Sequence, residues 1–381
     1  MRWVLNRLLP VCVLVVASCA PCDSPVAAPT LEYLGQARLA RHTVFEGTVV
    51  GGLSGISYDA RRDCFYVISD DRSAAGPARF YTVSLELSER GVGGVHISGV
   101  HPLLDDGGRP FAALNVDASP PVVPPDPEGI AFDSTRNRLY WTSEGERDGT
   151  VLADPWIRIA ALNGGYLGRF DIPPQLVMSA ERTGPRRNRT LEGLSVTADG
   201  RMLFAAMEGP GYDDGPVPDQ AHGALTRITA YGLDSGNRWA TPVAQYVYPL
   251  EPAPADAEPG QTNGLTDLVA LSDTEFLVIE RAFSLRPTVR LFRAGIGSDP
   301  AATDVLGVPA LKGAQVVPMT KTLLVDLSAV PGLDLVDNIE GITLGPRLPD
   351  GRQTLVLVSD DNFSPRQVTQ FVVFAIPARG A

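Results

Sequence analysis

The sequence is poor in the residues that build most zinc and redox sites. It contains four cysteines and four histidines in 381 residues, with no C-x-x-C pair near a cluster of histidines and no H-E-x-x-H spacing. These absences argue against a zinc centre. Cys22 and Cys64 could form a disulfide in an oxidising compartment, although Cys64 also suits a strand as a small apolar residue.

Other common signatures are missing as well. No glycine-rich phosphate loop precedes a helix, and no dinucleotide fingerprint occurs. The stretch "GGLSGIS" around Ser54 lacks the spacing of a G-x-S-x-G nucleophile elbow, which argues against a serine esterase. Basic residues number 32 against 44 acidic ones, for a net charge of -12. This balance disfavours a nucleic-acid partner and is compatible with cation binding.

The first residues read as a targeting segment. Arg2 and Arg7 precede an apolar stretch, residues 8–17, that is too short to span a bilayer. The sequence "VASC" resembles a bacterial lipobox, which would make Cys19 the lipidated N-terminus. The alternative is a secreted or periplasmic protein cleaved after Ala28. We therefore expect residues 1–28 to be a leader and tether of an exported cell-envelope lipoprotein, and residues 29–381 to be one domain.

A long internal repeat is the strongest signal in the chain. "DPEGIAFDSTRNRLYWTSEGE" and "RTLEGLSVTADGRMLFAAMEGP" share an acid-Gly pair, an apolar run, a polar turn, a second apolar run and a final acid. Aligning all units on Gly55, Gly129, Gly193, Asp267 and Gly341 gives intervals of 74, 64, 74 and 74 residues. Such a period is typical of stacked structural units.

Each unit predicts four strands. In the second unit these are "GIAFD", "RLYWTSE", "WIRIAAL" and "GYLGRFDIP", and no long helical pattern occurs anywhere. We predict an all-β fold, a single β-propeller of five or six four-stranded blades. Six stays open because residues 101–127 and 306–337 could contain extra strands.

The two ends of the domain predict closure of the ring. The last unit ends with "QVTQFVVFAI", only three strands into its blade. "LEYLGQARL" (Leu31–Leu39) can supply the fourth strand. Pairing of these N- and C-terminal strands would remove the free sheet edges.

The recurring acids predict a site. In a propeller blade the first strand lines the channel and the second runs antiparallel beside it, so acids at the start of one and the end of the other share a face. The acids at the second point are Asp70, Glu144, Glu208, Glu280 and Asp360. Those at the first point are Glu128, Glu192 and Glu340, with Asp267 displaced by one place, and Asp71 and Asp361 add charge beside them.

Such a concentration of like charge needs a neutraliser. Ca²⁺ prefers carboxylate oxygens, and arginines also lie near the same strand ends. The alternative is structural, because repeated acids can accept hydrogen bonds from backbone N–H groups of the adjacent blade. We predict that Ca²⁺ is held by Asp70, Asp71, Glu128, Glu192, Asp267, Glu280, Glu340, Asp360 and Asp361. We predict that Glu144 and Glu208 are catalytic.

At these residues the chain resembles the phytase-like family named for "esterase-like activity of phytase". The similarity is carried by "GGLSGISYDARRDCFYVISDDRSAAGPARFYTVSLEL" and "NIEGITLGPRLPDGRQTLVLVSDDNFSPRQVTQFVVFAI", and it covers nearly all of residues 31–378. The resemblance implies an exported bacterial propeller. The β-propeller phytases are similar in fold and acidic mouth; in them calcium binds substrate phosphates and activates water. By that resemblance the substrate would be clamped by Arg72, Arg189, Arg281 and Arg286.

Three functions follow as hypotheses. The first is a calcium-assisted hydrolase of phosphoric or related esters, acting as a monomer on a small-molecule ester and touching a membrane only through its lipid anchor. The second is a calcium-dependent lactonase-type propeller with one central ion. The third is a non-catalytic propeller that binds a ligand or protein at the cell envelope.

Overall fold

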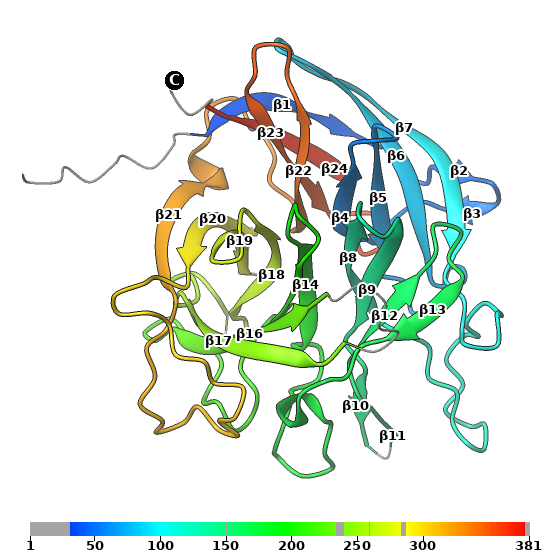
Figure 1. Ribbon diagram of the computed structural model, residues 1–381. Coiled ribbons are helices and arrows are strands. Elements are labelled where there is room, and N and C mark those ends of the chain that lie inside the picture. Colours follow the sequence, from blue (N-terminus) through cyan, green and yellow to red (C-terminus); the bar gives the residue numbers. More distant parts are fainter. Residues whose placement is uncertain (1–30, 150, 234–239, 259, 283–286, 378–381) are drawn as a thin grey trace, which may run out of the picture.

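The fold is a five-bladed β-propeller. The computed structural model describes residues 31–149, 151–233, 240–258, 260–282 and 287–377. Within them, five four-stranded antiparallel sheets surround one axis (Figure 1). Figure 1 shows one strand of each sheet near the centre and another at the periphery. The predicted all-β propeller is confirmed, with five blades in the described part of the chain.

The bounds of the strands follow the repeat. The first blade contains β4 (Leu53–Asp59), β5 (Cys64–Ser69), β6 (Arg79–Ser88) and β7 (Gly91–Pro102). The second contains β8 (Pro127–Asp133), β9 (Arg138–Ser143), β12 (Trp156–Ala160) and β13 (Tyr166–Arg169). The third contains β14 (Leu191–Val196), β15 (Met202–Met207), β16 (Ala224–Gly232) and β17 (Pro242–Leu250). The fourth contains β18 (Asn263–Ala270), β19 (Glu275–Ala282), β20 (Thr288–Gly295) and β21 (Thr320–Asp326).

The fifth blade joins the two ends of the domain. Its strands are β22 (Ile339–Arg347), β23 (Gln353–Ser359), β24 (Gln370–Ile376) and β1 (Glu32–Arg38). β1 pairs antiparallel with β24, so that Arg38 lies opposite Gln370. The predicted closure by N- and C-terminal strands is therefore confirmed, and the pairing removes the exposed edge that β24 would otherwise present.

The remaining elements are short. Two hairpins lie outside the blades: β2 (Val44–Phe45) with β3 (Thr48–Val49), and β10 (Glu146–Asp148) with β11 (Val151–Ala153). Of the two segments suspected of hiding a sixth blade, residues 101–127 contain isolated bridges, and the other supplies β21. The helices of the described part are the 3₁₀ turns η1 (Pro174–Leu176) and η2 (Leu327–Ala329), and neither approaches the length or hydropathy of a membrane span.

Apolar side chains fill the space between neighbouring blades. Phe204 of the third blade meets Phe276 of the fourth edge-to-face, with ring centroids 4.7 Å apart. Tyr66 of the first blade packs against Phe132 of the second in a tilted arrangement, with ring centroids 5.4 Å apart. Each blade is covered by its neighbours on both faces. Strands near the axis, such as β5 and β23, are therefore buried almost throughout instead of alternating between buried and exposed residues.

The innermost strands approach one another so closely that side chains are excluded. β4, β8, β14, β18 and β22 contact each other in a closed ring. At the level of the aligned glycines a Cβ on Gly129 would lie 2.4 Å from the carbonyl oxygen of Glu192, and one on Gly341 would lie 2.3 Å from that of Ser54. Gly55 and Gly193 meet the next blade just as closely. Only glycine fits these four positions.

Asp267 takes the fifth position at this level and fastens three blades together. Its carboxylate accepts backbone N–H groups of Leu194 at 3.2 Å, Leu268 at 2.8 Å and Ile342 at 2.8 Å. These donors belong to β14, β18 and β22. The sequence predicts Asp267 as a metal ligand, whereas the structure gives both of its oxygens to the backbone. This is the structural alternative for the recurring acids.

We expect Gly129→Ala to destabilise the protein by about 1–3 kcal/mol, the usual cost of overpacking, because the new methyl group meets backbone that cannot move without separating two blades. Chemical denaturation measures the change. Gly307→Ala is the control, since nothing lies within 4 Å of a Cβ at this exposed glycine. Equal stability of the two variants would contradict the close packing at the axis.

Candidate functional site

Acids gather at one end of the axis because of strand register. In four blades, one more backbone hydrogen bond follows the last residue pair of the two innermost strands. Its donor is the N–H of an acid and its acceptor a carbonyl before the first strand: Asp70 to Gly52 at 2.6 Å, Glu144 to Asp126 at 3.1 Å, Glu208 to Thr190 at 2.7 Å and Asp360 to Asn338 at 2.9 Å. Four blades therefore place an acid at the equivalent position beside the axis.

The fourth blade places an arginine there. Gly264 pairs with Arg281, and Leu265 pairs with Glu280. In the third blade Leu194 pairs with Ala205, eleven positions later, whereas at the equivalent place in the fourth blade Leu268 pairs with Val278, only ten positions later. The β18–β19 connection is therefore one residue shorter than the β14–β15 connection. A one-residue slip turns every side chain to the other face of the strand.

Glu280 consequently lies away from the axis, and its predicted place among the axial acids is wrong. It accepts hydrogen bonds from Tyr248 at 2.8 Å and from the backbone of Glu251 at 2.9 Å, and it pairs with Lys321. Glu280 is 1% exposed, so this buried carboxylate is already neutralised by its own lysine.

A second row of side chains comes from the innermost strands themselves. The residues directly before Gly55, Gly129, Gly193, Asp267 and Gly341 form this row. They are Ser54, Glu128, Glu192, Thr266 and Glu340. Asp126 lies just before β8, and one of its carboxylate oxygens is within 4.8 Å of one of Glu128. We call the resulting eight carboxylates the axial acid cluster. Its members are Asp70, Asp126, Glu128, Glu144, Glu192, Glu208, Glu340 and Asp360.

The cluster is buried except for the partly exposed Asp70, and it is only partly hydrogen-bonded. Glu144 and Asp360 are 1% exposed, and Glu208, at 8%, is the most exposed glutamate of the cluster. Ser54 donates to Glu128 at 3.0 Å, and the backbone N–H of Thr190 donates to Glu144 Oε1 at 2.5 Å. Buried polar atoms normally have partners. Here Glu144 Oε2, Thr266 Oγ1 and Asn338 Oδ1 are buried without one among the described residues.

Three arginines offset part of the charge. Arg281 lies 3.0 Å from Glu340 and 3.8 Å from Glu208. Arg189 lies 3.6 Å from Glu208, and Arg72 lies 3.6 Å from Asp126. Eight carboxylates against three guanidinium groups leave an excess of five negative charges if all are ionised. The excess is concentrated beside blades one to three.

Burial and mutual repulsion hold these acids toward their protonated forms. Burial, followed by the charges of Asp70 and Glu192, raises the pKa of Glu128 well above its ordinary value. Burial also raises the pKa values of Asp70, Glu144, Glu192 and Asp360 well above the usual range, with neighbouring carboxylates adding to the effect. The same cause raises the pKa of Asp126 and that of Glu340, despite the nearby arginines. Protons or a further cation must balance the cluster.

Two triads of carboxylates have the spacing of a cation site. One oxygen each from Asp70, Asp126 and Glu128 lie within 4.8 Å of one another, and so do oxygens from Glu128, Glu144 and Glu192. Calcium–oxygen distances of about 2.4 Å place two ligand atoms at most about 4.8 Å apart. The donor set is all oxygen, as calcium requires. Glu128 belongs to both triads.

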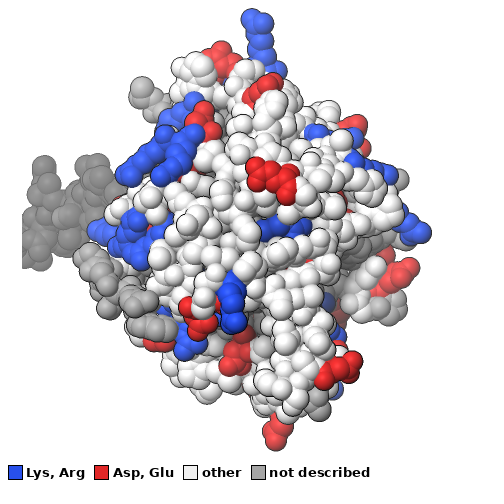
Figure 2. Space-filling model, turned by 90° about the vertical axis from the view of Figure 1, so that its right-hand side faces the viewer, with Lys and Arg blue, Asp and Glu red and all other residues white. Residues whose placement is uncertain are grey.

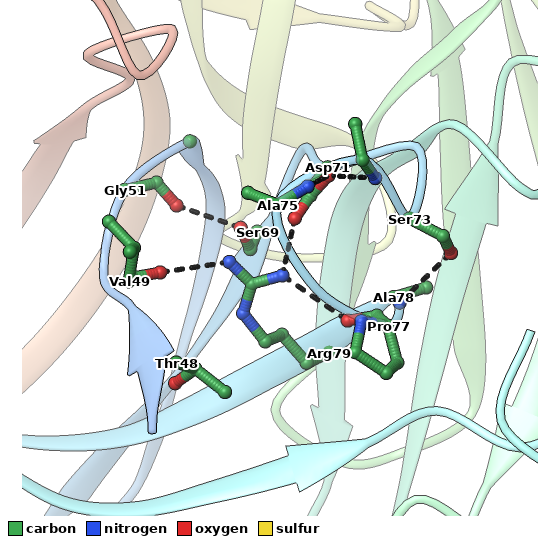
Figure 3. A network of polar contacts seen from close by, with 12 residues as sticks. Thr48, Val49, Gly51, Ser69, Asp71, Ser73, Ala75, Pro77, Ala78 and Arg79 are labelled. Carbon is green, nitrogen blue, oxygen red and sulfur yellow. Dashed lines mark hydrogen bonds and ion pairs between the residues drawn. The ribbon is translucent and has the colours of Figure 1, made fainter. Parts of the chain in front are cut away.

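Two predicted ligands instead hold loops beside the cluster. Figure 3 shows Asp71 accepting N–H groups from the loop and pairing with the buried guanidinium of Arg79 at 2.6 Å. Arg79 also donates to the carbonyls of Val49 and Pro77. Because Asp70 and Arg72 flank Asp71 in the chain, this network fixes where they lie.

Asp361 has a comparable role at the fifth blade. It accepts the N–H of Gly52 at 2.9 Å, that of Phe363 at 3.0 Å and the hydroxyl of Thr369 at 3.0 Å. The first of these bonds joins the fifth blade to the first. Of the other predicted site residues, Arg286 and Cys19 lie outside the described residues.

The sequence prediction missed several residues of the site. Asp126 was recognisable from its period-two spacing to Glu128. Glu146 and Arg187 lie next to the cluster, where Arg72 pairs with Glu146 at 2.5 Å and Arg187 with Glu146 at 2.9 Å. Glu146 lies in the short hairpin strand β10 and Arg187 in a connecting segment, and neither position belongs to the repeat.

The excess negative charge of the axial acid cluster lies mostly inside the molecule, at one end of the axis. On the face drawn in Figure 2, acidic and basic side chains are intermingled on a mostly uncharged surface. The far ends of the innermost strands surround an opening of ≈ 250 Å³ lined by apolar and hydroxyl side chains such as Ile56, Phe132 and Thr343, with no acid or base among its lining residues.

Solved structures with a related arrangement are distant. The exo-β-1,3-galactanase of Phanerochaete chrysosporium is 12% identical with a TM-score of 0.44; the match covers 89% of this chain and 64%, just under two thirds, of that one. The periplasmic gluconolactonase of Pseudomonas aeruginosa is 11% identical with a TM-score of 0.36, over 87% of this chain and 90% of that one. With both TM-scores below 0.5, neither informs the site. No curated protein matches the sequence.

A family match covers most of the domain. The model of the phytase-like family, described as "Esterase-like activity of phytase", matches residues 48–363. This range contains every blade's innermost strand and the whole axial acid cluster. The chain belongs to the phytase-like family.

Proposed function

We propose that the protein is a calcium-assisted hydrolase of phosphoric or related esters. The carrying observation is the axial acid cluster, in which eight carboxylates, seven of them buried, face three guanidinium groups and a buried oxygen of Glu144 has no partner among the described residues. Leaving such charge unpaired is costly. The family description supports ester chemistry.

The residues of the two triads would hold the calcium. Glu128 stands between them, with Asp70 and Asp126 on one side and Glu144 and Glu192 on the other. Calcium, when bound, supplies positive charge that polarises an ester oxygen and acidifies water. The family resemblance and the oxygen donor set both favour calcium over softer metals.

Glu144 is suited to act as a general base. Its Oε1 accepts the N–H of Thr190, and its unpartnered Oε2 can accept a proton once bound calcium offsets the negative charge that raises the pKa of Glu144. Glu208 is held between Arg189 and Arg281 and would keep both guanidinium groups in place. Arg72 and Arg189, with side chains 28% and 25% exposed, are the predicted clamps that a substrate can reach.

A non-catalytic propeller is the second candidate, and one observation favours it. Most members of the axial acid cluster are less than 10% exposed, as expected for a cation that only joins blades. A lactonase-type hydrolase with one central ion is a third candidate. Comparing lactones with phosphate esters as substrates separates it from the phosphoric-ester hydrolase.

We also propose that the chain is exported as a monomer, with residues 1–28 as leader and Cys19 as the site of lipidation, or else secreted or periplasmic. This rests on the residues of the leader. Its substrate would be a small ester, with no nucleic acid involved.

Calcium should raise the melting temperature. A ligand present at about 100 times its dissociation constant stabilises the native state by about 2.7 kcal/mol, which is roughly 4 °C for a domain of this size. Thermal melting in calcium and in chelator measures the shift. Glu128→Gln should abolish most of it, because Glu128 serves both triads. Glu275→Gln, which breaks a surface pair with Arg293, is the control. Identical melting with and without calcium would remove the metal from the proposal.

The catalytic roles predict a separate result. The double variant Glu144→Gln, Glu208→Gln should lower turnover at least about 100-fold, the usual contribution of a general base, while far-UV circular dichroism stays unchanged. Phosphate monoesters, phytate and lactones form the substrate panel. Full activity of the folded variant would rule out both roles, whereas unfolding would favour the structural role; Glu144→Asp, which keeps the charge, then tests the base alone.

Without calcium, stability should fall as pH rises. Asp70, Asp126, Glu128, Glu144, Glu192, Glu340 and Asp360 have pKa values raised above the unfolded values of about 4. The native state therefore binds more protons than the unfolded state. Their contribution is complete below about pH 4 and is lost as pH rises through the raised values. Melting in chelator from pH 5 to 8 tests this. Calcium should abolish the decline, and a rise in stability over that range in chelator would contradict it.

A further inference from the structure

Three arginines converge on one tyrosine near the axial acid cluster. The guanidinium carbons of Arg186, Arg147 and Arg182 lie 4.5, 4.7 and 5.3 Å from the ring centroid of Tyr212. No two of them can therefore be more than about 10 Å apart, a separation similar to the Debye length of physiological salt. We call these four residues the arginine–tyrosine cluster.

The cluster stands at the acidic end of the axis, between the second and third blades. Arg147 follows Glu144 by three residues, and Arg186 precedes Thr190 by four. Tyr212 follows Glu208 by four. Since Glu144, Thr190 and Glu208 all lie at the axis, the loops that leave them bring the arginines to the rim of the proposed site.

The guanidinium groups of the cluster are not matched by carboxylates. Arg147 donates to the carbonyls of Glu181, Thr183 and Pro185. Arg186 donates to the carbonyls of Pro210, Gly211 and Gly215. Neighbouring arginines differ, since Arg187 pairs with Glu146 and Arg189 with Glu208. Within the described residues, the cluster thus carries positive charge with no acid at ion-pair distance.

The nearest acids are engaged elsewhere. Asp213 accepts the N–H of Gly184, and Asp214 forms a buried pair with Arg227 at 2.6 Å. Burial and the charges of Arg189 and Arg182 lower the pKa of Arg186, as expected where like charges repel. A guanidinium has five N–H groups. The carbonyls take three bonds from Arg147 and three from Arg186, so donors remain for an anion.

We propose that Arg147, Arg182 and Arg186 on Tyr212 form an anion subsite that binds a phosphate group of the substrate. Three guanidinium groups exceed what one carboxylate can neutralise, whereas a phosphate dianion offers three terminal oxygens for charge-assisted bonds. This assigns a substrate class, a phosphate ester with more than one anionic group, and it rests on the proposed function. A neutral lactone would leave the subsite empty.

Binding of inorganic phosphate in chelator tests the subsite apart from any calcium. Isothermal titration calorimetry should show binding to the full chain and a loss of about tenfold or more in affinity for Arg182→Gln, since a hydrogen bond to a charged group contributes roughly that much. Arg182 is exposed, so its replacement spares the core. Arg201→Gln is the matched control, because Arg201 is an exposed arginine of the third blade that pairs with Asp199 in the turn at the other end of its strands.

The outcomes separate the two proposals. Phosphate binding that Arg182→Gln weakens and Arg201→Gln leaves alone supports the subsite, even if calcium does not bind. No binding by the wild type, or equal binding by both variants, overturns it. In an active preparation, Arg182→Gln should raise KM for a phosphate monoester about tenfold without changing kcat; an equal rise for a lactone would also overturn the assignment.

Discussion

The close approach of five strands at the axis determines where the functional side chains lie. Backbone meets backbone at Gly55, Gly129, Gly193 and Gly341, where no Cβ fits. The residue before each glycine is thereby held beside the axis, and the acid that follows the second strand of the same blade closes on the innermost strand nearby. Acids at these positions are brought together by packing, even though their charges repel.

The departure of the fourth blade from the repeat gives the site its asymmetry. A connection one residue shorter brings Arg281 to the axis where the other blades have an acid, and Thr266 replaces the glutamate of the innermost strand. Arg281 offsets the charges of Glu340 and Glu208. Uncompensated charge is left beside the first three blades, where both triads of carboxylates lie.

Much of this could be predicted from the sequence. The 74-residue period implied blades, the unpaired first strand implied closure, and the acid at each end of a two-strand unit implied a common face. Glu280 was misplaced because it was chosen as the acid of its strand, whereas the register puts the next residue, Arg281, at the axis, and one residue reverses the face of a strand. Asp71 and Asp361 were assigned to the site by adjacency alone, although their neighbours in space are Arg79 and Gly52.

The pairing of β1 with β24 has a consequence for the order of assembly. Arg38 and Gln370 are opposite one another in the sheet but more than 300 residues apart in the chain. The ring cannot shut until β24 has been synthesised, and such distant contacts make folding slow. Until then β1 has no partner strand and is open to pairing with other chains, so a nascent molecule would benefit from a chaperone during that interval.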